Sequence, residues 1–352
     1  MMPKTLEINP QYPEEDKIKT AADVLLRGGL VIIPTETVYG IAADMRNKDA
    51  LKRLYKIKKR PQDKPFSLLI NDKDALEIFA QEPSLIAFKL IDKFWPGPLT
   101  LVLSSPQGET VGLRMPDNNI ALKLITALGA PVFCPSANLS GEPAPVNFQD
   151  AIKGLGDKVD LAIDGGKARL GIESSVVDLT KSPYKIQRQG AIKAEEIDKV
   201  AGRKVVLFVC TGNSCRSVMA QAYLKKKLIE GGREDIEVLS AGTINISGLG
   251  ASTETKKVLE AEGIDAQDHR SSSLNSLTIK ESDIILVMEK IHEQRIAEMV
   301  PQARKRLYLL KEFANIEDGS LEIEDPIGRS SEFHQQTFSV IKQAIDQIIK
   351  IL

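Results

Sequence analysis

The sequence predicts a protein of two α/β domains, and three observations support this. Its 352 residues exceed the roughly 150 residues of a typical single domain. Short apolar runs alternate with amphipathic helical stretches, as in α/β folds. After residue 201 the alternation begins again with KVVLFV. We therefore expect residues 1–201 to form a twisted open α/β sheet and residues 202–352 to form a doubly wound parallel sheet.

The first half contains a predicted helix over 17–27, ended by Gly28-Gly29, and a buried strand over 30–33. A second helix is expected over 49–60, with many Lys and Arg residues on its outer face. Further strands are predicted at 67–70, 99–103, 111–114, 132–134, 161–163 and 175–179, with a closing strand and turn at 186–192. Alternating strands and helices predict parallel strands with helices on both faces.

The second half opens with a strand over 204–209, a polar loop and a helix over 217–230 that Gly231-Gly232 ends. Strands are then predicted at 237–243, 282–288 and 307–310. Helices are expected around 252–262, 291–299 and 331–351, the last with an apolar stripe. This pattern again predicts a parallel sheet.

Composition excludes several classes of protein. Hydrophobic residues make up 42% and charged residues 27%, an ordinary globular balance, and the net charge of −1 does not suit a DNA-binding domain. Three cysteines are too few for a disulfide scaffold and fit a reducing compartment. No apolar run approaches the ~20 residues of a membrane helix, and the first residues do not resemble a signal peptide. We expect a cytoplasmic protein with neither membrane nor DNA as a partner.

The stretch CTGNSCRS, residues 210–217, lies between a predicted buried strand and a helix. A short loop with Gly212 and Asn213 can turn its backbone N–H groups inward and form an anion site at a helix N-terminus. Such a site favours the Cys210 thiolate, the form that attacks phosphorus. The Arg216 guanidinium can bind two phosphoryl oxygens, and Ser217 can donate a hydrogen bond toward the Cys210 sulfur. The alternative is a buried structural cysteine beside a helix cap.

Residues 203–352 resemble the low-molecular-weight protein-tyrosine phosphatases, whose signature is Cys, five residues, Arg and Ser. The resemblance includes SAGT at 240–243 and the late pair Asp325-Pro326. It implies that Cys210 is the nucleophile, Arg216 the phosphate clamp and Asp325 the general acid, with no metal or organic cofactor. A redox or docking module is the alternative, which the complete motif disfavours.

Two loop residues bear on regulation and specificity. Cys215 either forms a reversible disulfide that shields Cys210 or simply packs beneath the loop, and both interpretations stay open. Ser214 occupies a position that is aliphatic in tyrosine-directed relatives and Thr in protein-arginine phosphatases of the family. Its hydroxyl leaves phosphotyrosine and phosphoarginine both open as the phosphoprotein substrate. The scattered histidines are expected to be solvated or locally bonded.

The first half carries a run of basic residues from Arg46 to Lys64 but no Walker motif. A solvated helix face is the ordinary interpretation of such a run. The more specific interpretation is a binding site for a polyanion, with Lys58 and Arg60 at the end of the helix. Polar clusters follow two strands, at 34–40 and 134–141, where open α/β sheets bind ligands.

Residues 10–200 resemble YrdC-type threonylcarbamoyl-AMP synthases. The motifs that carry the resemblance are IPTETVYG, Lys58-Lys59-Arg60, FWPGPLTLVL, VGLRMP, Ser136-Ala137-Asn138, DGG, ESSVVDL and RQGAI. It implies that L-threonine, bicarbonate and ATP react to give threonylcarbamoyl-AMP and pyrophosphate, with Mg²⁺ carried on the ATP phosphates. It places Lys58, Arg60, Ser136, Asn138 and Arg188 at the nucleotide and Thr35, Arg114 and Ser174 near threonine.

The sequence departs from this family after the basic motif, where Lys64 and Leu69 stand at positions often held by Asn and His. The missing His bears on threonine contacts rather than on nucleotide binding. An RNA-binding or carbamoyl-transfer module is the alternative for this half. The preferred interpretation is a bifunctional enzyme whose first product passes to the tRNA threonylcarbamoyl transferase complex.

Overall fold

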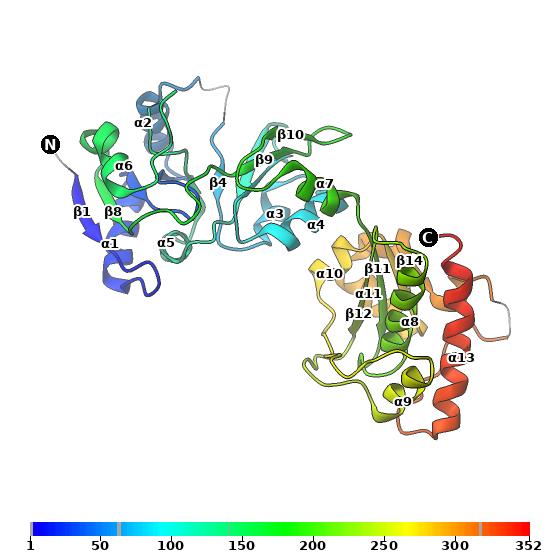
Figure 1. Cartoon of the computed structure of the whole chain (residues 1–352). Helices are drawn as coiled ribbons and strands as arrows, with labels where there is room; N and C mark the ends of the chain where they lie inside the picture. The colour runs from blue at the N-terminus through cyan, green and yellow to red at the C-terminus, as the bar shows by residue number, and fades with distance from the viewer. Residues whose placement is uncertain (1–2, 62–64, 140, 317–318) are drawn as a thin grey trace. The chain divides into compact units, whose positions relative to one another are not determined.

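The chain divides into two compact units, residues 1–200 and 201–352. The computed structural model describes residues 3–61, 65–139, 141–316 and 319–352, and Figure 1 shows their helices and strands from the N-terminus in blue to the C-terminus in red. Each unit has its own sheet and its own hydrophobic core.

The described residues of the first unit form one ten-stranded sheet in the order β1-β8-β2-β3-β7-β4-β6-β5-β9-β10. Its strands are β1 (Lys4–Glu7), β2 (Val31–Ile33), β3 (Gly40–Asp44), β4 (Leu68–Leu69), β5 (Leu99–Ser104), β6 (Thr110–Arg114), β7 (Val132–Phe133), β8 (Leu161–Asp164), β9 (Ser175–Asp178) and β10 (Lys185–Arg188). Its helices are α1 (Glu15–Leu26), α2 (Lys48–Lys58), α3 (Ala75–Phe79), α4 (Leu85–Phe94), α5 (Asn119–Leu128), α6 (Phe148–Leu155) and α7 (Ala194–Gly202).

The α/β class is confirmed, but the expectation of parallel strands is wrong for this unit, because its sheet is mixed. Strand β2 pairs antiparallel with β3, β5 with β6, and β9 with β10. Residues 34–39 and 105–109 are too few to cross over a sheet, since a parallel connection needs a dozen or more residues. Each short connection therefore turns the chain back beside the strand it has just left.

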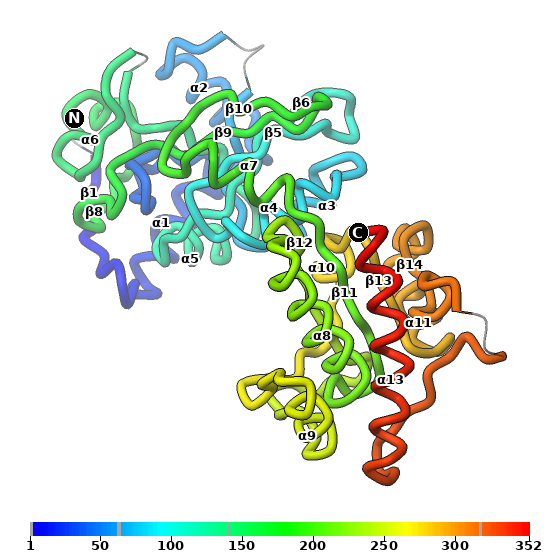
Figure 2. The backbone as a smooth tube through the Cα atoms, turned by 45° about the vertical axis from the view of Figure 1, so that its right-hand side comes forward, coloured from blue at the N-terminus to red at the C-terminus, as the bar shows by residue number. Residues whose placement is uncertain are grey.

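Helices cover both faces of this part of the sheet (Figure 2). Helices α1 and α5 pack against one face, where Val31 and Ile33 of β2 point. Helices α2 and α6 pack on the other face, against Leu30 and Ile32. The continuous apolar run of β2 is thus explained by burial on both sides.

The second unit has an all-parallel sheet in the order β12-β11-β13-β14, as predicted. Its elements are β11 (Lys204–Cys210), α8 (Arg216–Glu230), β12 (Ile236–Gly242), α9 (Thr253–Ala261), α10 (Ser276–Glu281), β13 (Ile284–Val287), α11 (Lys290–Met299), β14 (Leu307–Leu309), α12 (Leu310–Phe313) and α13 (Ser331–Ile348). Alternate residues of the central strand β11 enter two separate cores: Val206 and Phe208 meet α8 and α13, whereas Leu207 and Val209 meet α10 and α11.

Several elements are absent from the sequence-based expectations. They include the strands β1 and β3 and the helices α3, α4, α5, α6, α7, α10 and α12. Strand β3 has the sequence GIAAD, whose small residues give little strand signal, yet its five residues are buried. In the described parts of the chain no helix is long and apolar enough to cross a membrane.

A core substitution should separate the stabilities of the two units. Phe208 is fully buried in the second unit, so Phe208→Ala should destabilise that unit by about 3–5 kcal/mol. The single tryptophan, Trp95, lies in the first unit and reports its unfolding alone by fluorescence, whereas far-ultraviolet circular dichroism reports both. Only the circular dichroism transition should move. A matching shift of the Trp95 transition would show that the two units unfold together.

Candidate active sites

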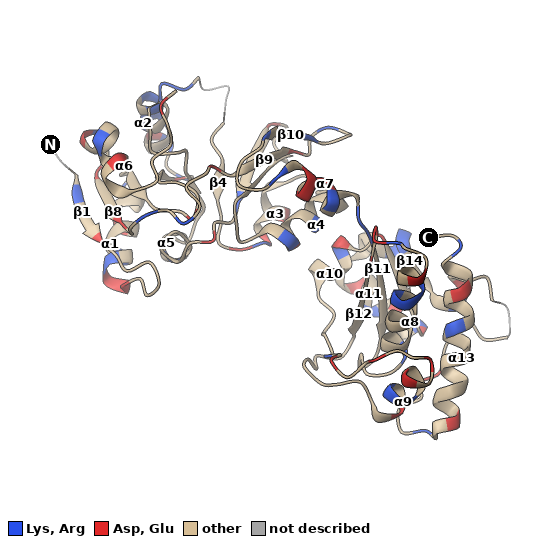
Figure 3. Cartoon of the chain, in the orientation of Figure 1, with Lys and Arg blue, Asp and Glu red and all other residues tan. Residues whose placement is uncertain are grey.

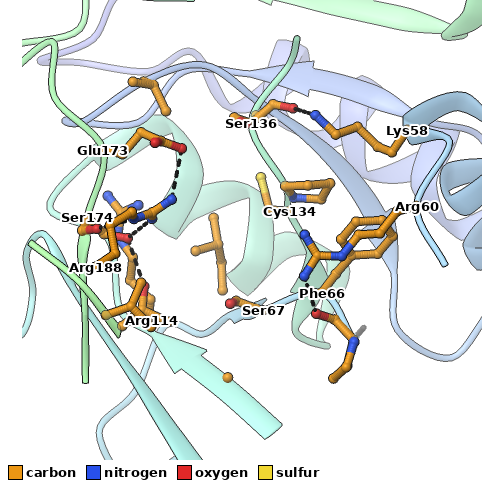
Figure 4. A pocket seen from close by; sticks show the side chains of 18 of the residues that line it. Lys58, Arg60, Phe66, Ser67, Arg114, Cys134, Ser136, Glu173, Ser174 and Arg188 are labelled. Carbon is orange, nitrogen blue, oxygen red and sulfur yellow. Dashed lines mark hydrogen bonds and ion pairs between the residues drawn. The ribbon is translucent and has the colours of Figure 1, made fainter. Parts of the chain in front are cut away.

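The first unit contains a cavity of about 800 Å³ (Figure 4). Every residue that the sequence analysis places at nucleotide or threonine lines it: Thr35, Lys58, Arg60, Arg114, Ser136, Asn138, Ser174 and Arg188. Leu69, the residue that replaces the family's His, lines it as well. The cavity therefore gathers residues that lie as far as 150 positions apart in the chain.

Lys58 is the last residue of α2 and is only 6% exposed. Asn47 caps the start of this helix, and Lys59 ends it in the left-handed conformation. The Lys58 ammonium donates hydrogen bonds to the Ser136 carbonyl at 2.7 Å, the Asn138 carbonyl at 2.6 Å and Asn138 Oδ1 at 3.0 Å. Burial, with the nearby Arg60 charge, lowers the pKa of Lys58 to about 8. One buried ammonium thus joins both predicted nucleotide-binding motifs.

The basic run divides into two kinds of residue. Figure 3 marks the Lys and Arg positions of α2 in blue. Lys52 pairs with Asp49 and Arg53 with Asp160 on the exposed face, as expected of a solvated helix. Lys58 instead turns inward. Lys64, the end of the run, lies outside the described residues.

Arg60 follows the helix and lies against an aromatic surface. Its guanidinium carbon is 5.1 Å from the Phe66 ring centre, and its Nη2 donates to the Pro65 carbonyl at 3.1 Å. Phe66 in turn contacts Tyr55 of α2, with ring centres 4.5 Å apart. The stacking holds the guanidinium at the cavity.

The segment between β2 and β3 is held by its own side chains. Thr35 Oγ1 donates to the Val38 carbonyl at 2.7 Å and lies 2.8 Å from Thr37 Oγ1. Gly40 has no room for a side chain, since a Cβ there would lie 2.4 Å from the Cys134 sulfur. Burial raises the pKa of the Cys134 thiol to about 12.

Arg114 leaves the end of β6 and is buried among polar partners. Its Nη2 lies 2.8 Å from Glu36 Oε1 and donates to Thr37 Oγ1 at 2.8 Å, while Nε donates to the Gly97 carbonyl at 3.3 Å. Glu36 is 2% exposed. The carboxylate compensates a guanidinium that would otherwise be buried without a counter-charge.

A second arginine lies on another wall of the cavity. Arg188 donates to the Ser174 carbonyl at 2.9 Å, to Ser174 Oγ at 3.1 Å and to Glu173 Oε1 at 3.0 Å. Ser174 Oγ also lies 2.9 Å from Thr100 Oγ1. Figure 4 places Glu173, Ser174, Arg188 and Arg114 on one side of the cavity and Lys58 and Arg60 on the other.

In the second unit, the loop after β11 holds the predicted cysteine site. Cys210 Sγ lies 2.9 Å from Ser217 Oγ, and the Asn213 amide donates to Ser217 Oγ at 3.0 Å and to Ser240 Oγ at 2.8 Å. Asn213 adopts the left-handed conformation, with φ of 50°. Gly242 lets the loop approach β12, because a Cβ there would lie 2.9 Å from the Thr211 carbonyl oxygen.

The loop backbone is arranged to receive an anion. Within the described chain, the amide N–H groups of residues 212–217 have no hydrogen-bond acceptor. They precede and begin α8, a helix of 15 residues, whose N-terminus favours negative charge. Unpaired N–H groups in the loop that follows Cys210 are compatible with the anion site that the sequence predicts.

Arg216 is fully buried and bound by two carboxylates. Its Nη1 lies 2.5 Å from Glu289 Oε2 and donates to the Ile323 carbonyl at 2.7 Å. Its Nη2 pairs with Asp325. The structure therefore brings together Cys210, Ser217, Arg216 and Asp325, with the guanidinium held in place before a phosphate arrives.

The histidines are locally bonded, and two of them are buried. His292 lies 3.0 Å from Thr211 Oγ1 through Nε2, and burial, with the Arg216 charge, lowers its pKa to about 4. His269 Nε2 lies 2.9 Å from the Asn213 carbonyl. His334 Nδ1 lies 3.0 Å from the Ser330 carbonyl. In the described residues no group of three or more His, Cys, Asp or Glu side chains is placed to hold a metal.

Cys215 and Ser214 are the two remaining residues of the loop after β11. Cys215 is buried, and its Sγ lies 3.4 Å from Ser252 Oγ. Ser214 is partly exposed, and its hydroxyl lies 3.6 Å from the Cys215 sulfur. A Cβ built on the neighbouring Gly212 would lie 3.8 Å from Ile244 Cδ1, so an aliphatic side chain also borders the loop.

Apart from Asp325, the sequence analysis missed the carboxylates at these sites. Glu289 lies two residues after β13, at the carboxyl end of a parallel strand where ligands bind, so its position was a usable signal. Glu173 stands next to Ser174 in a quoted motif, and Glu36 next to Thr35. Their pairing with arginines could not be read from the order of the residues.

Comparisons with known proteins agree with this division. Residues 23–190 match the Sua5/YciO/YrdC family model, described as telomere recombination, and residues 205–352 match that of the low molecular weight phosphotyrosine protein phosphatases. The threonylcarbamoyl-AMP synthase of Pyrococcus abyssi is 42% identical over 198 residues, which cover 54% of this chain and 58% of that protein. The putative threonylcarbamoyl-AMP synthase of Mycobacterium tuberculosis H37Rv is 36% identical over 195 residues, 53% of this chain and 89% of that protein.

A solved structure of a double variant of Pyrococcus abyssi Sua5 is 29% identical, with a TM-score of 0.53, and the match covers 84% of this chain and 97% of that one. The chain spans only 58% and 57% of the lengths of the Pyrococcus abyssi and Bacillus subtilis synthases that it matches. Its first unit nonetheless matches nearly all of shorter relatives. The chain therefore belongs to the Sua5/YciO/YrdC family and joins to that domain a low-molecular-weight phosphatase domain.

Proposed function

We propose that the first unit converts L-threonine, bicarbonate and ATP into threonylcarbamoyl-AMP and pyrophosphate. The observation that carries this proposal is the cavity in which Lys58, Arg60, Arg114 and Arg188 meet Ser136 and Asn138. Binding a triphosphate requires several cations in one place, and neutral hydroxyl and amide groups suit a nucleoside. An RNA-binding module would not require a deep cavity of this kind.

Each side chain has a role in this proposal. ATP enters as its Mg²⁺ complex, and Lys58 and Arg60 neutralise its phosphates and the charge that develops on the leaving pyrophosphate. Ser136 and Asn138 hold the nucleotide, and Arg188 closes on it. The Arg114 guanidinium binds the threonine carboxylate beside Thr35 and Ser174. The product is consumed by the enzyme system that transfers the threonylcarbamoyl group to tRNA.

Nucleotide binding should depend on pH through Lys58. The pKa of this ammonium is lowered to about 8, so Lys58 is charged below that pH and loses its charge above it. Affinity for a non-hydrolysable ATP analogue, measured by isothermal titration calorimetry, should therefore fall from about pH 7 to 9.5, and Lys58→Arg should flatten the profile because Arg stays protonated. Equal affinity of the unmodified protein across this range would contradict the assignment of Lys58.

We propose that the second unit is a cysteine-dependent phosphatase of phosphoproteins. What supports it is the pairing of Cys210 and Ser217 beneath unpaired loop N–H groups, with Arg216 and Asp325 alongside. The Cys210 thiolate attacks phosphorus, Asp325 gives a proton to the departing oxygen or nitrogen, and water then hydrolyses the cysteinyl phosphate. Phosphate takes the place of Asp325 on the Arg216 guanidinium.

The two activities should be separable by single substitutions. Cys210→Ser removes the nucleophile and should abolish hydrolysis of para-nitrophenyl phosphate, while threonine-dependent pyrophosphate release continues. Lys58→Ala should lower pyrophosphate release by a factor on the order of 10² or more and leave the phosphatase rate unchanged. Loss of both activities from either substitution in a folded protein would contradict the modular proposal.

Specificity of the phosphatase should depend on Ser214. We propose that its hydroxyl favours phosphoarginine by helping to position the hydrolytic water, whereas an aliphatic side chain there would complete an apolar wall with Ile244. The unmodified enzyme should act on phosphoarginine at least as efficiently as on phosphotyrosine, and Ser214→Ile should shift the ratio of kcat/KM values toward phosphotyrosine. Ser214→Thr serves as the matched control, because it keeps the hydroxyl. An unchanged ratio in Ser214→Ile would exclude this role.

A further inference from the structure

We propose that Glu173 binds the ammonium group of the amino-acid substrate and accepts its proton, which makes the amine a nucleophile. This inference rests on the proposed synthase function and assigns a catalytic residue to the same cavity. It uses a side chain that the roles above leave without a task.

The cavity is strongly cationic, with one exception. Its described lining residues include Lys58, Lys59, Arg60, Arg114 and Arg188, and among them Glu173 is the single carboxylate. A triphosphate uses positive charge, but an α-amino acid also carries an ammonium that needs a negative partner. Arg114 is paired with Glu36, but the other four cations would repel that group in the absence of a carboxylate. Among the described lining residues, Glu173 alone can compensate it.

Arg114 and Glu173 are placed to bind the two charged ends of an amino-acid zwitterion. Figure 4 shows Glu173 on the same side of the cavity as Ser174 and Arg114, across from Lys58 and Arg60. With the substrate carboxylate on Arg114, the ammonium can reach Glu173 on the same wall.

The carboxylate is both accessible and held in place. Its side chain is 40% exposed, so a ligand can contact it. The Glu173 carbonyl accepts a hydrogen bond from the Ala191 amide at 2.9 Å, and Gly190 approaches so closely that a Cβ there would lie 2.2 Å from that oxygen. Arg188 Nη1 binds Oε1 at 3.0 Å, and within the described residues Oε2 accepts no hydrogen bond. One carboxylate oxygen is therefore open to the substrate.

Carbamate formation and its transfer to ATP balance in protons and bonds. The ammonium gives one proton to the Glu173 carboxylate and becomes a neutral amine. The amine nitrogen then bonds to the carbon of bicarbonate, one carbon–oxygen bond breaks, and water leaves, which yields the carbamate. The carbamate oxygen attacks the α-phosphorus of ATP and displaces pyrophosphate.

The experiment compares two ligands that differ only at the amine. Calorimetric titrations measure binding of L-threonine and of 2,3-dihydroxybutyrate, which carries a hydroxyl in place of the ammonium, in the presence of a non-hydrolysable ATP analogue. Glu173→Gln keeps an oxygen acceptor for Arg188 but removes the charge and the basicity. Arg188→Gln is the matched control for a role of Glu173 that acts only through Arg188.

The unmodified protein should bind threonine more tightly than dihydroxybutyrate. Glu173→Gln should weaken threonine binding by about tenfold or more, leave dihydroxybutyrate binding unchanged, and reduce threonine-dependent pyrophosphate release by a factor on the order of 10². Arg188→Gln should keep the preference for threonine.

Three results would overturn the inference. Equal threonine affinity in Glu173→Gln and the unmodified protein would exclude the ammonium contact. Weakened binding of the Mg²⁺–nucleotide complex with unchanged threonine preference would assign Glu173 to the metal. Loss of the preference in Arg188→Gln as well would make Glu173 a support for Arg188. If one of these results is obtained but the unmodified protein binds threonine and releases pyrophosphate, only the role of Glu173 fails and the synthase proposal still stands. If the unmodified protein neither binds threonine nor releases pyrophosphate, the proposed function itself fails.

Discussion

A buried cationic side chain needs a partner in the protein, and this requirement shapes both sites. Lys58 is bound by three oxygens of residues 136–138, Arg114 by Glu36, and Arg216 by Glu289 and Asp325. Removing Glu36, for example, would leave the buried Arg114 guanidinium without its counter-charge. The cations are therefore oriented before an anionic ligand arrives, which spares the ligand the cost of ordering them.

The same requirement links segments that are distant in the chain. The three hydrogen bonds of Lys58 tie the end of α2 to the segment after β7, and the Arg114 pair ties the end of β6 to the segment after β2. In the second unit, Arg216 connects the start of α8 with Glu289, two residues after β13, and with the loop of Asp325. The carboxyl ends of strands meet there, so polar side chains from several elements converge on one place.

How much of this could be predicted from the sequence depended on the kind of signal. Apolar runs located β2 and β11 because both are buried on two faces, but such a run reports burial and says nothing of strand direction. The mixed sheet follows from short connections such as residues 34–39, because a connection of this length cannot cross over to a parallel neighbour. Motifs identified Lys58, Ser136, Cys210 and Arg216, whereas the carboxylates that hold the arginines come from elsewhere in the chain and need the folded structure.

The thiol of Cys134, enclosed beside Gly40, has a consequence for how the chain meets oxidants and electrophiles. Because burial raises its pKa to about 12, this sulfur stays protonated at physiological pH and is a poor nucleophile. Thiol reagents should therefore react with Cys210 and Cys215 in preference to Cys134, so that mild peroxide treatment should inactivate the second unit before the first.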